Sequence, residues 1–576
     1  MRPHVSLGQH SQAGDHAQNQ DFHGAILPEG HARLSKGIAL AIADGISSSA
    51  LSHLASQTAV RGFLDDYYAT SEAWSVRRAA QGIIGATNSW LHAQTQRGEG
   101  RFDADRGYVC TFTALILKGR DFHLFHVGDA RVFRLHAHAL EQLTEDHRLR
   151  LSAAEEYLAR ALGANASVEI DYHSWEAVPQ EVYLLATDGA YTHFTAADVH
   201  AALARHSDDL DAVARDLVEV ARTRGSTDDA TVLVLRVETL EEDALPLPQR
   251  RREGLALPPP LQAGMLFEGF RILRALQVTA RSHIHLAVDE ASGQQLVLKT
   301  PATDLRENAA YLDGFVLEEW VARRVHSPHV IRPWMGERAR HSLFVAMEYI
   351  EGPTLAQWMA DHPRPALEPV RTLIEQLGAG LQALHHREML HQDLRPENVM
   401  IDADGTVKLI DLASAHVAGL AEGLPTGSPA AAPGSLQYMA PEYLLGKGGS
   451  PRADLFALAA ITYQMLCGRL PYGLDAARIR TPKDLRKLHY APVRLYRPEL
   501  PAWLDQVLEK ALQPDAALRQ EAVSEFIHDL RHPDTRFAST QRQPFIERDP
   551  LLFWKCATAL SSLLAIGLLV LRAIGH

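Results

Sequence analysis

The chain has few cysteines and no basic stripe. Only three cysteines occur in 576 residues, at Cys110, Cys467 and Cys556, far apart in apolar settings. This excludes a disulfide framework and a CxxC metal site, and it favours a reducing compartment. A formal net charge of −13 without a basic stripe argues against nucleic-acid binding. The first residues also lack an apolar h-region, so we expect no secretory signal peptide.

The length of the chain exceeds what one hydrophobic core supports. With 576 residues and 46% hydrophobic residues, the sequence predicts two to four globular domains. The stretch from Glu241 to Gln262 combines prolines with charges and shows no apolar periodicity, which indicates an extended or flexible connector. We therefore predict domains at 1–238 and 267–535, a linker at 239–266, and a polar stalk at 536–550.

Near its C-terminal end the chain has a long apolar run. From Leu551 to Leu571 the only charge is Lys555. About twenty-one helical residues reach roughly 30 Å, the thickness of the hydrocarbon core of a bilayer. We predict a single transmembrane helix at 551–573 that anchors the chain in the cytoplasmic (inner) membrane, with the preceding domains in the cytoplasm. The alternative is a buried final helix.

Four strand-like apolar runs of the first domain each meet an acidic residue. They are 37–45 (GIALAIADG), 122–129 (FHLFHVGD), 182–189 (VYLLATDG) and 228–237 (DDATVLVLRV). Carboxylates just outside strand ends can converge at one rim while apolar residues face a shared core. Clustered carboxylates repel one another unless cations lie among them, and an all-oxygen ligand set suits Mg²⁺ or Mn²⁺.

Together with Asn19-Gln20-Asp21, the order NQD, ADG, VGD, TDG, STDDAT resembles the metal-dependent type 2C (PPM) serine/threonine phosphatases. The resemblance implies an αββα sandwich, two or more bound Mg²⁺ or Mn²⁺ ions and hydrolysis of phosphoserine and phosphothreonine. It implies metal ligands at Asp21, Asp44, Gly45, Asp129, Asp188 and Asp228, with Gly45 acting through its carbonyl. The chain departs from the family in two ways: Asp15 and His16 stand where an arginine usually grips the substrate phosphate, and Ile46 stands where some members have a histidine.

The second domain carries the pattern HxDLxxxN, followed by a strand and a further aspartate. His391, Asp393, Leu394 and Asn398 fill the pattern, and Asp411 follows the apolar run 407–410. Phosphoryl transfer requires one carboxylate that orients the attacking hydroxyl, and an amide oxygen and second carboxylate that hold magnesium. These residues predict a site for a metal-bound nucleotide.

This half of the chain resembles the Hanks-type serine/threonine protein kinases, which implies a bilobal fold and Mg²⁺-ATP as cofactor. The resemblance implies that Asp393 is the catalytic base and that Asn398 and Asp411 are the magnesium ligands. It also places Arg395 among the catalytic residues, where these kinases usually carry a lysine. Upstream, Lys299 matches the catalytic lysine that contacts the ATP phosphates, and Glu318 matches its ion-pair partner, with Glu319 as the alternative. The hinge that receives adenine corresponds to Met347-Glu348-Tyr349.

The kinase-like half departs from its family at three places. The stretch 277–282 (QVTARS) contains no glycine where the family has GxGxxG, and Arg281 is a candidate phosphate contact there. Gln392 replaces the arginine of HRD, so activation by loop phosphorylation is not expected. Asp411-Leu412-Ala413 replaces DFG.

Two hypotheses follow. In the first, the chain is a membrane-anchored bifunctional phosphatase and kinase that acts on protein substrates, including its own Thr426, Ser428 or Ser435. In the second, the kinase-like half is a pseudokinase, a docking or nucleotide-sensing module that regulates an active phosphatase.

Overall fold

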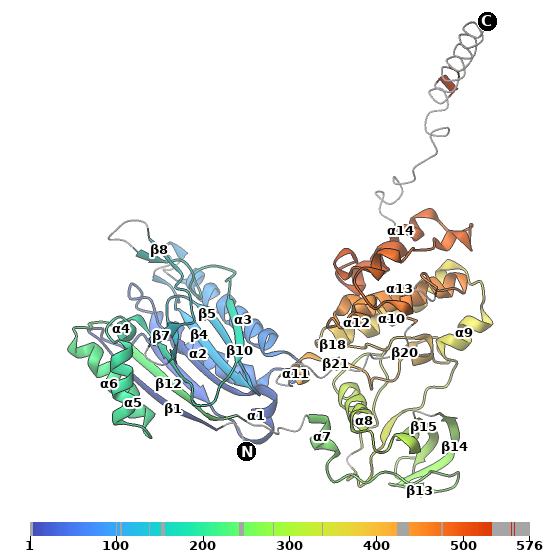
Figure 1. The fold of residues 1–576 in the computed structure, drawn as a ribbon, viewed down its shortest axis with the longest axis horizontal. Coiled ribbons are helices and arrows are strands. Elements are labelled where there is room, and N and C mark those ends of the chain that lie inside the picture. The colour runs from blue at the N-terminus through green and yellow to red at the C-terminus, as the bar shows by residue number, and fades with distance from the viewer. Residues whose placement is uncertain are drawn as a thin grey trace, which may run out of the picture.

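The fold is described from a computed structural model, shown in Figure 1. The described residues are 4–98, 101–103, 106–136, 139–150, 156–240, 247–279, 282–336, 338–422, 437–473 and 476–532, together with 554, 555 and 558.

The first domain contains two five-stranded antiparallel sheets that pack face to face. One has the order β1 (His4–Gln12), β12 (Ala230–Thr239), β11 (Val182–Ala186), β6 (Arg131–His136), β7 (Ala139–Gln142). The other has the order β10 (Asp171–Glu176), β5 (Asp121–Val127), β4 (Phe112–Lys118), β3 (Ile38–Ala43), β2 (Phe22–Ile26). Side chains such as Leu40 and Leu115 from one sheet and Leu185 and Leu233 from the other form the core between them.

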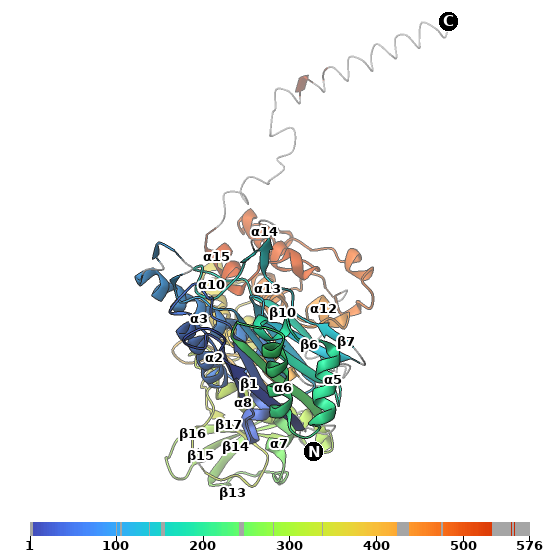
Figure 2. The same ribbon diagram turned by 90° about the vertical axis from the view of Figure 1, so that its left-hand side faces the viewer.

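Helix pairs cover the outer faces of both sheets, which completes an αββα sandwich. The pair α2 (Ser52–Ala69) and α3 (Val76–Arg97) packs on β3 and β4, and the pair α5 (Ala196–Arg205) and α6 (Leu210–Thr223) packs on the other sheet. Figure 2 views the molecule with α5 and α6 in front. The segment from 196 to 223 thus forms two helices. They separate at 206–209 because the Asp209 side chain accepts a hydrogen bond from the backbone N–H of Ala212 and caps α6 (3.0 Å).

The connector between the domains contains a helix, whereas a flexible or partly extended segment was expected. Helix α7 (Leu247–Arg252) packs on α8 (Ala309–Ala322). Gln249 donates a hydrogen bond to Asp313 (3.1 Å), and Arg252 forms an ion pair with the same carboxylate (3.4 Å). These polar contacts hold a segment whose sequence shows no apolar periodicity.

The second domain is bilobal. Its smaller lobe is an antiparallel sheet of β13 (Leu266–Phe267), β14 (Phe270–Val278), β15 (Ser282–Asp289), β16 (Gln295–Pro301) and β17 (Val345–Glu348), with α8 beside it. The larger lobe is helical, with α9 (Leu355–Asp361), α10 (Leu367–His385), α13 (Pro451–Cys467), α14 (Ala502–Ala511) and α15 (Val523–Arg531).

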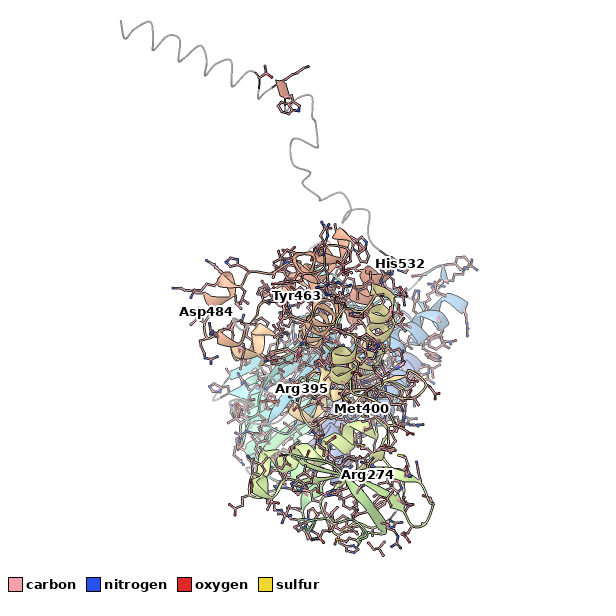
Figure 3. The ribbon with its side chains drawn as sticks, turned by 90° about the vertical axis from the view of Figure 1, so that its right-hand side faces the viewer. Arg274, Arg395, Met400, Tyr463, Asp484 and His532 are labelled. Atoms are coloured by element: carbon pink, nitrogen blue, oxygen red, sulfur yellow. The ribbon has the colours of Figure 1, made fainter. Side chains whose placement is uncertain are left out.

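Short elements of the larger lobe follow α10 in the chain. They are β18 (Met389–Leu390) paired with β21 (His416–Val417), β19 (Val399–Ile401) paired with β20 (Val407–Leu409), α11 (Ala418–Ala421) and α12 (Pro441–Leu444). In Figure 3, Arg395 and Met400 lie between the sheet that carries Arg274 and the helices that carry Tyr463.

Among the described residues, no helix combines the length and the apolar character needed to cross a membrane. Apart from 554, 555 and 558, the expected anchor at 551–573 lies outside the described residues, as do Arg281, Thr426, Ser428 and Ser435.

Candidate functional site

Five aspartates of the first domain gather at one rim of the sandwich. Each lies beside a strand: Asp21 precedes β2, Asp44 follows β3, Asp129 follows β5, Asp188 begins α4 (Asp188–Tyr191) after β11, and Asp228 precedes β12. Burial raises the pKa of Asp44 well above its ordinary value, and the neighbouring carboxylates, Asp21 first among them, raise it further. The structure therefore brings together the five carboxylates predicted as metal ligands.

The cluster leaves buried oxygens available to a cation. Thr187 and Thr231 donate hydrogen bonds to Asp21 Oδ2 (2.8 and 2.6 Å), whereas Asp21 Oδ1 and Asp188 Oδ1 are buried without a hydrogen-bond partner among the described residues. Burial raises the pKa of Asp21 to about 7. Unpaired buried carboxylate oxygens are costly unless a cation binds them. The donor set thus fits the hard divalent ions Mg²⁺ and Mn²⁺.

Gly45 lies where the chain turns from β3 toward α2. Its N–H donates to the carbonyl of Gln20 (3.1 Å), which ties it to the segment that carries Asp21. A Cβ atom here would lie 2.7 Å from the Cβ of Ser52, so a side chain would push α2 away. The structure therefore requires glycine at this position for packing, in addition to the carbonyl role predicted from the sequence.

Arg148 is a residue of this site that sequence reasoning missed. It lies at the start of β8 (Arg148–Arg150), and its guanidinium contacts Asp129 Oδ2 (2.7 Å) and Asp188 Oδ2 (2.9 Å). Burial and Asp188 raise the pKa of Asp129, while Arg148 opposes the shift. The arginine thus supplies part of the positive charge that the cluster needs.

Asp229 and His16 were also missed. Asp229 accepts hydrogen bonds from the backbone N–H groups of Gly14 and Gln20 (both 2.7 Å), and it is 2% exposed. His16 Nδ1 lies 3.3 Å from Asp229 and 3.7 Å from Asp228. These three side chains could hold one metal ion. The pair Asp228-Asp229 does not by itself indicate that Asp229 holds the loop before Asp21 in place.

In the second domain, one lysine joins two acidic residues from different elements. Lys299 of β16 donates to Glu318 of α8 and to Asp411, each at 2.8 Å. Burial alone lowers the pKa of Lys299, but Glu318 and Asp411 outweigh it and hold the pKa above its ordinary value. Burial favours a higher pKa for Asp411, yet Lys299 keeps it below its ordinary range. The lysine is therefore charged and Asp411 ionised at neutral pH.

The predicted catalytic segment is held by buried polar contacts. Asn398 donates to the carbonyl of Asp393 (2.9 Å), and Asp454 of α13 accepts the backbone N–H groups of His391 and Gln392 (2.9 and 3.0 Å). Gln392 and Asp411 both have positive φ, at 64° and 62°. Such conformations cost free energy in non-glycine residues and persist where the surroundings fix them, commonly at functional sites.

Arg395 and Glu442 lie near this segment. Arg395 forms an ion pair with Glu397 (3.0 Å). Glu442 of α12 pairs through both of its oxygens with Arg519, whose side chain is fully buried (2.8 Å for each contact). This pair connects the end of the segment after Asp411 to the helical lobe.

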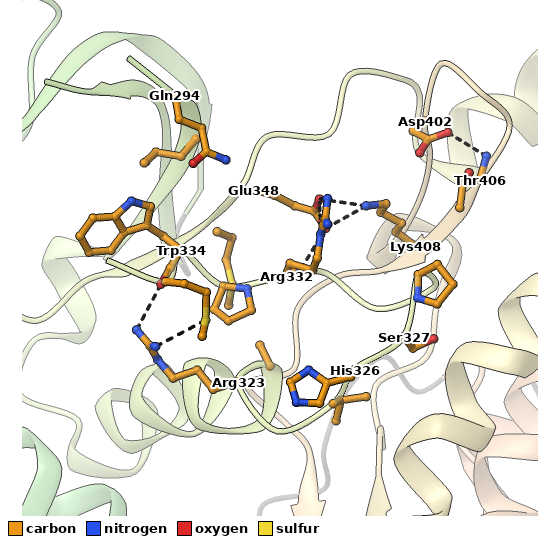
Figure 4. A pocket seen from close by; sticks show the side chains of 17 residues that line it. Gln294, Arg323, His326, Ser327, Arg332, Trp334, Glu348, Asp402, Thr406 and Lys408 are labelled. Carbon is orange, nitrogen blue, oxygen red and sulfur yellow. Dashed lines mark hydrogen bonds and ion pairs between the residues drawn. The ribbon is translucent and has the colours of Figure 1, made fainter. Parts of the chain in front are cut away.

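Met347 and Glu348 close the small sheet beside β16, where adenine is expected. Glu348 is paired with Leu296, while Val345 is paired with Lys299, so the Glu348 side chain lies on the face opposite Lys299. There it pairs with Lys408 (2.9 Å) and Arg332 (2.9 Å) in a separate pocket of about 730 Å³ (Figure 4). Only the backbone of Glu348 is therefore available to adenine.

Comparisons with known proteins match each half of the chain to a protein family. Residues 9–228 match the family model for protein phosphatase 2C, and residues 280–541 match the model for the protein kinase domain. A probable serine/threonine-protein kinase of Streptomyces coelicolor is 29% identical over 256 residues, 43% of this chain and 37% of the relative. Serine/threonine-protein kinase PknD of Mycobacterium tuberculosis is 28% identical over 260 residues, 45% of this chain and 38% of the relative.

The chain spans between 37% and 43% of the length of the first curated relatives. Among solved structures, the PknI kinase domain of Mycobacterium tuberculosis is 26% identical with a TM-score of 0.37, over 47% of this chain and 99% of that one. The phosphatase PstP of the same organism is 24% identical with a TM-score of 0.33, over 41% and 99%. The two family matches confirm the predicted pairing: this chain joins a protein phosphatase 2C domain to a Hanks-type protein kinase domain.

Proposed function

We propose that the chain is a bifunctional signalling enzyme that removes phosphate from phosphoserine and phosphothreonine and transfers phosphate from ATP to serine and threonine. The observation that carries the proposal is the presence of two separate sites built around acidic side chains. One is the five-aspartate rim with unpaired oxygens on Asp21 and Asp188, and the other is the Lys299, Glu318 and Asp411 cluster.

In the phosphatase domain, Asp21, Asp44, Asp188 and Asp228 and the Gly45 carbonyl would hold two divalent ions, with Asp129 as a ligand of a further one. When bound, these ions supply Lewis acidity for hydrolysis of the phosphate ester. The protein's own contribution is to fix the ligands. Thr187 and Thr231 orient Asp21, and Asp229 fixes the loop that carries it.

In the kinase domain, Lys299 would contact the ATP phosphates, and Glu318 would hold that lysine in place. Asn398 and Asp411 would hold magnesium, which neutralises the phosphate charge. Asp393 would orient the attacking hydroxyl and accept its proton, with Arg395 beside it. The backbone at Met347 and Glu348 would receive adenine.

The two activities are best tested in variants that silence one site at a time. In Asp44→Asn, which cannot erase its own product, we expect transfer of labelled phosphate from Mg²⁺-ATP to a protein acceptor, and loss of that transfer in Asp44→Asn/Asp393→Asn. In Asp393→Asn without ATP, we expect Mn²⁺-dependent release of phosphate from a phosphothreonine peptide. Absence of both reactions in folded protein would refute the proposal.

The second candidate function is a pseudokinase that regulates the phosphatase. The observation in its favour is the absence of glycine from 277–282, where bare backbone amides would otherwise cradle phosphates. Equal labelling in Asp44→Asn and Asp44→Asn/Asp393→Asn would support it. If the kinase is active, we expect phosphate on Thr426, Ser428 or Ser435 of Asp44→Asn, as mapped by mass spectrometry.

We further propose that the apolar run 551–571 anchors the chain as a single-pass protein of the inner membrane, with both catalytic domains in the cytoplasm. The support is the length of the run and its single charge. Membrane fractions washed at alkaline pH should retain the full chain and lose a chain that ends at residue 550. Release of both chains would contradict the anchor.

A further inference from the structure

The loop between α2 and α3 of the phosphatase domain packs against the kinase domain beside α11 (Figure 1). Ala73 in this loop is fully buried and belongs to the same hydrophobic cluster as the core residues of the kinase domain. Its carbonyl accepts a hydrogen bond from the N–H of Gly419 (2.9 Å). We call residues 72–76 the docking loop.

Gly419 lies in α11, in the segment that follows the predicted magnesium ligand Asp411. A Cβ atom at Gly419 would lie 2.3 Å from the carbonyl oxygen of Glu72 and 2.6 Å from that of Trp74. Both are backbone atoms, so they cannot move aside as a flexible side chain would. The close fit of the docking loop therefore depends on the absence of a side chain at Gly419.

Charges on the two domains compensate each other across this interface. Lys118 of the phosphatase domain has a 3% exposed side chain, and it donates to the carbonyl of Gly419 (2.7 Å) and to Glu422 (3.0 Å). Glu422 also accepts the N–H of Val76 at the start of α3 (3.0 Å), a position that favours a carboxylate. Without docking, the contacts of Glu422 to Lys118 and Val76 would be lost.

A second acidic residue of the kinase domain caps the same helix. Ser75, the N-cap of α3, donates to Glu388 through both its N–H (2.7 Å) and its hydroxyl (2.8 Å). Glu388 directly precedes β18 and the predicted catalytic segment, and its carbonyl accepts the N–H of Ala418 (3.1 Å). The phosphatase helix thus contacts two chain segments of the kinase domain that are themselves hydrogen-bonded.

The docking loop also contacts the end of α8. Glu72 forms an ion pair with Arg324 (2.7 Å), whose guanidinium stacks on Trp320 of α8 (3.9 Å). Helix α8 carries Glu318, the segment through Gly419 begins near Asp411, and the segment after Glu388 carries Asp393. The phosphatase domain therefore contacts the three elements that position the proposed kinase site.

We propose that the phosphatase domain is the activating partner of the kinase domain, a brace that holds α8, the catalytic segment and the start of the segment after Asp411 in their working arrangement. This inference rests on the proposed kinase activity. Gln392 stands where an arginine would pair with a phosphorylated loop, so the chain lacks that means of ordering the segment. The docking loop supplies protein contacts in its place.

Substitution of Gly419 tests the brace with a matched control. In full-length Gly419→Ala the added methyl group should separate the domains, whereas in Gly448→Ala it enters open space, with no atom within 4 Å. We expect amide hydrogen exchange of residues 416–422 and 72–76 to accelerate at least tenfold in Gly419→Ala only.

Phosphate transfer by Gly419→Ala, measured in an Asp44→Asn background, should fall at least tenfold. Hydrolysis of p-nitrophenyl phosphate by Gly419→Ala without the Asp44 change should persist, which shows that the phosphatase domain is folded.

A charge exchange adds a rescue experiment. Glu72→Arg and Arg324→Glu should each loosen the interface, and the double variant should restore slow exchange and phosphate transfer, because the pair is re-formed with reversed polarity. Fast exchange with unchanged transfer in Gly419→Ala would overturn the brace, as would exchange equal to that of Gly448→Ala. If Asp44→Asn with Gly419 unchanged transferred no phosphate, the kinase activity and the brace's activating role would both fall. Faster hydrogen exchange in Gly419→Ala than in Gly448→Ala would then still show that the two domains dock.

Discussion

Arg148 places a permanent positive charge between Asp129 and Asp188, within the cluster proposed to bind metal ions. We expect Arg148→Gln to bind Mn²⁺ about tenfold more tightly, since removing roughly 1.4 kcal/mol of opposing interaction changes affinity tenfold. Titration calorimetry on the metal-free chain would measure this. Arg134→Gln is the control, because Arg134 pairs with Glu141 (2.6 Å). Unchanged or weaker affinity in Arg148→Gln would show that the arginine does not compete with the ions.

Glu318 gives the kinase site a pH dependence. Burial raises the pKa of Glu318 to about 7, although Lys299 opposes the shift. As the pH falls from 8 to 6, Glu318 takes up a proton and its attraction to Lys299 weakens, so we expect the rate of phosphate transfer to fall, with its midpoint near pH 7. Glu318→Gln should lack this acidic limb and be about 10- to 100-fold slower. Initial rates of phosphate transfer at saturating Mg²⁺-ATP, measured from pH 6 to pH 8, would test this. The control is Glu319→Gln, because Glu319 pairs with Arg323 (2.7 Å).

Single residues of the two sites could be predicted where a short motif carries them. The aspartates beside strand ends and the Lys299, Asp393, Asn398 and Asp411 set were identified in this way, and the structure brings the members of each set together. Arg148, Asp229 and His16 could not be predicted from such patterns. Their roles arise from contacts between segments distant in the chain, and an isolated arginine or histidine is usually exposed.

At the scale of elements, the pair between Glu442 and Arg519 fastens α12 to the helical lobe. The Arg519 side chain is fully buried and that of Glu442 is 10% exposed. Removal of one partner leaves a buried charge, so Arg519→Ala should lower the free energy of unfolding of the kinase domain by about 3–5 kcal/mol. The exposed pair between Lys487 and Asp484 is the control, and Lys487→Ala should cost less than about 1 kcal/mol. Urea unfolding followed by circular dichroism would compare the two variants, and equal losses would contradict the prediction.

Elements with strong periodicity were predictable, whereas their ends and breaks were not. Helix α8 begins at Ala309, where the side chain of Asn308 caps it by accepting a hydrogen bond from the N–H of Tyr311. The boundary between α5 and α6 depends on one hydrogen bond from Ala212 to Asp209. Helix α7 forms within a polar connector because Asp313 of α8 supplies partners for Gln249 and Arg252. Such contacts are tertiary, so local sequence does not reveal them.

At the scale of the whole molecule, metal binding should stabilise the phosphatase domain directly. Addition of Mn²⁺ at about 100 times its dissociation constant should stabilise that domain by about 2.7 kcal/mol, and EDTA should reverse the effect. Differential scanning calorimetry of the full chain would follow both domains. In Gly419→Ala we expect Mn²⁺ to leave the kinase transition unchanged, since the domains are then uncoupled. Asp44→Asn should abolish the response, and a response that persists would place the ions elsewhere.

The order of domains was predictable from the sequence, but their contact was not. Each domain carries its own motifs, so each could be assigned independently. The docking loop consists of Glu72, Ala73, Trp74, Ser75 and Val76, and nothing in these residue types indicates an interface. Their partners Glu388, Gly419 and Glu422 lie hundreds of residues away in the chain, and only the folded structure shows that they meet.

The attachment of α7 to α8 has a consequence for how tightly the two domains must recognise each other. Only six residues separate the end of the phosphatase sandwich at Leu240 from α7 at Leu247. So short a tether gives each domain an effective concentration of the other on the order of millimolar. Contacts too weak to hold two free proteins together therefore suffice within one chain. A phosphatase domain supplied as a separate molecule at micromolar concentration would leave most kinase domains alone.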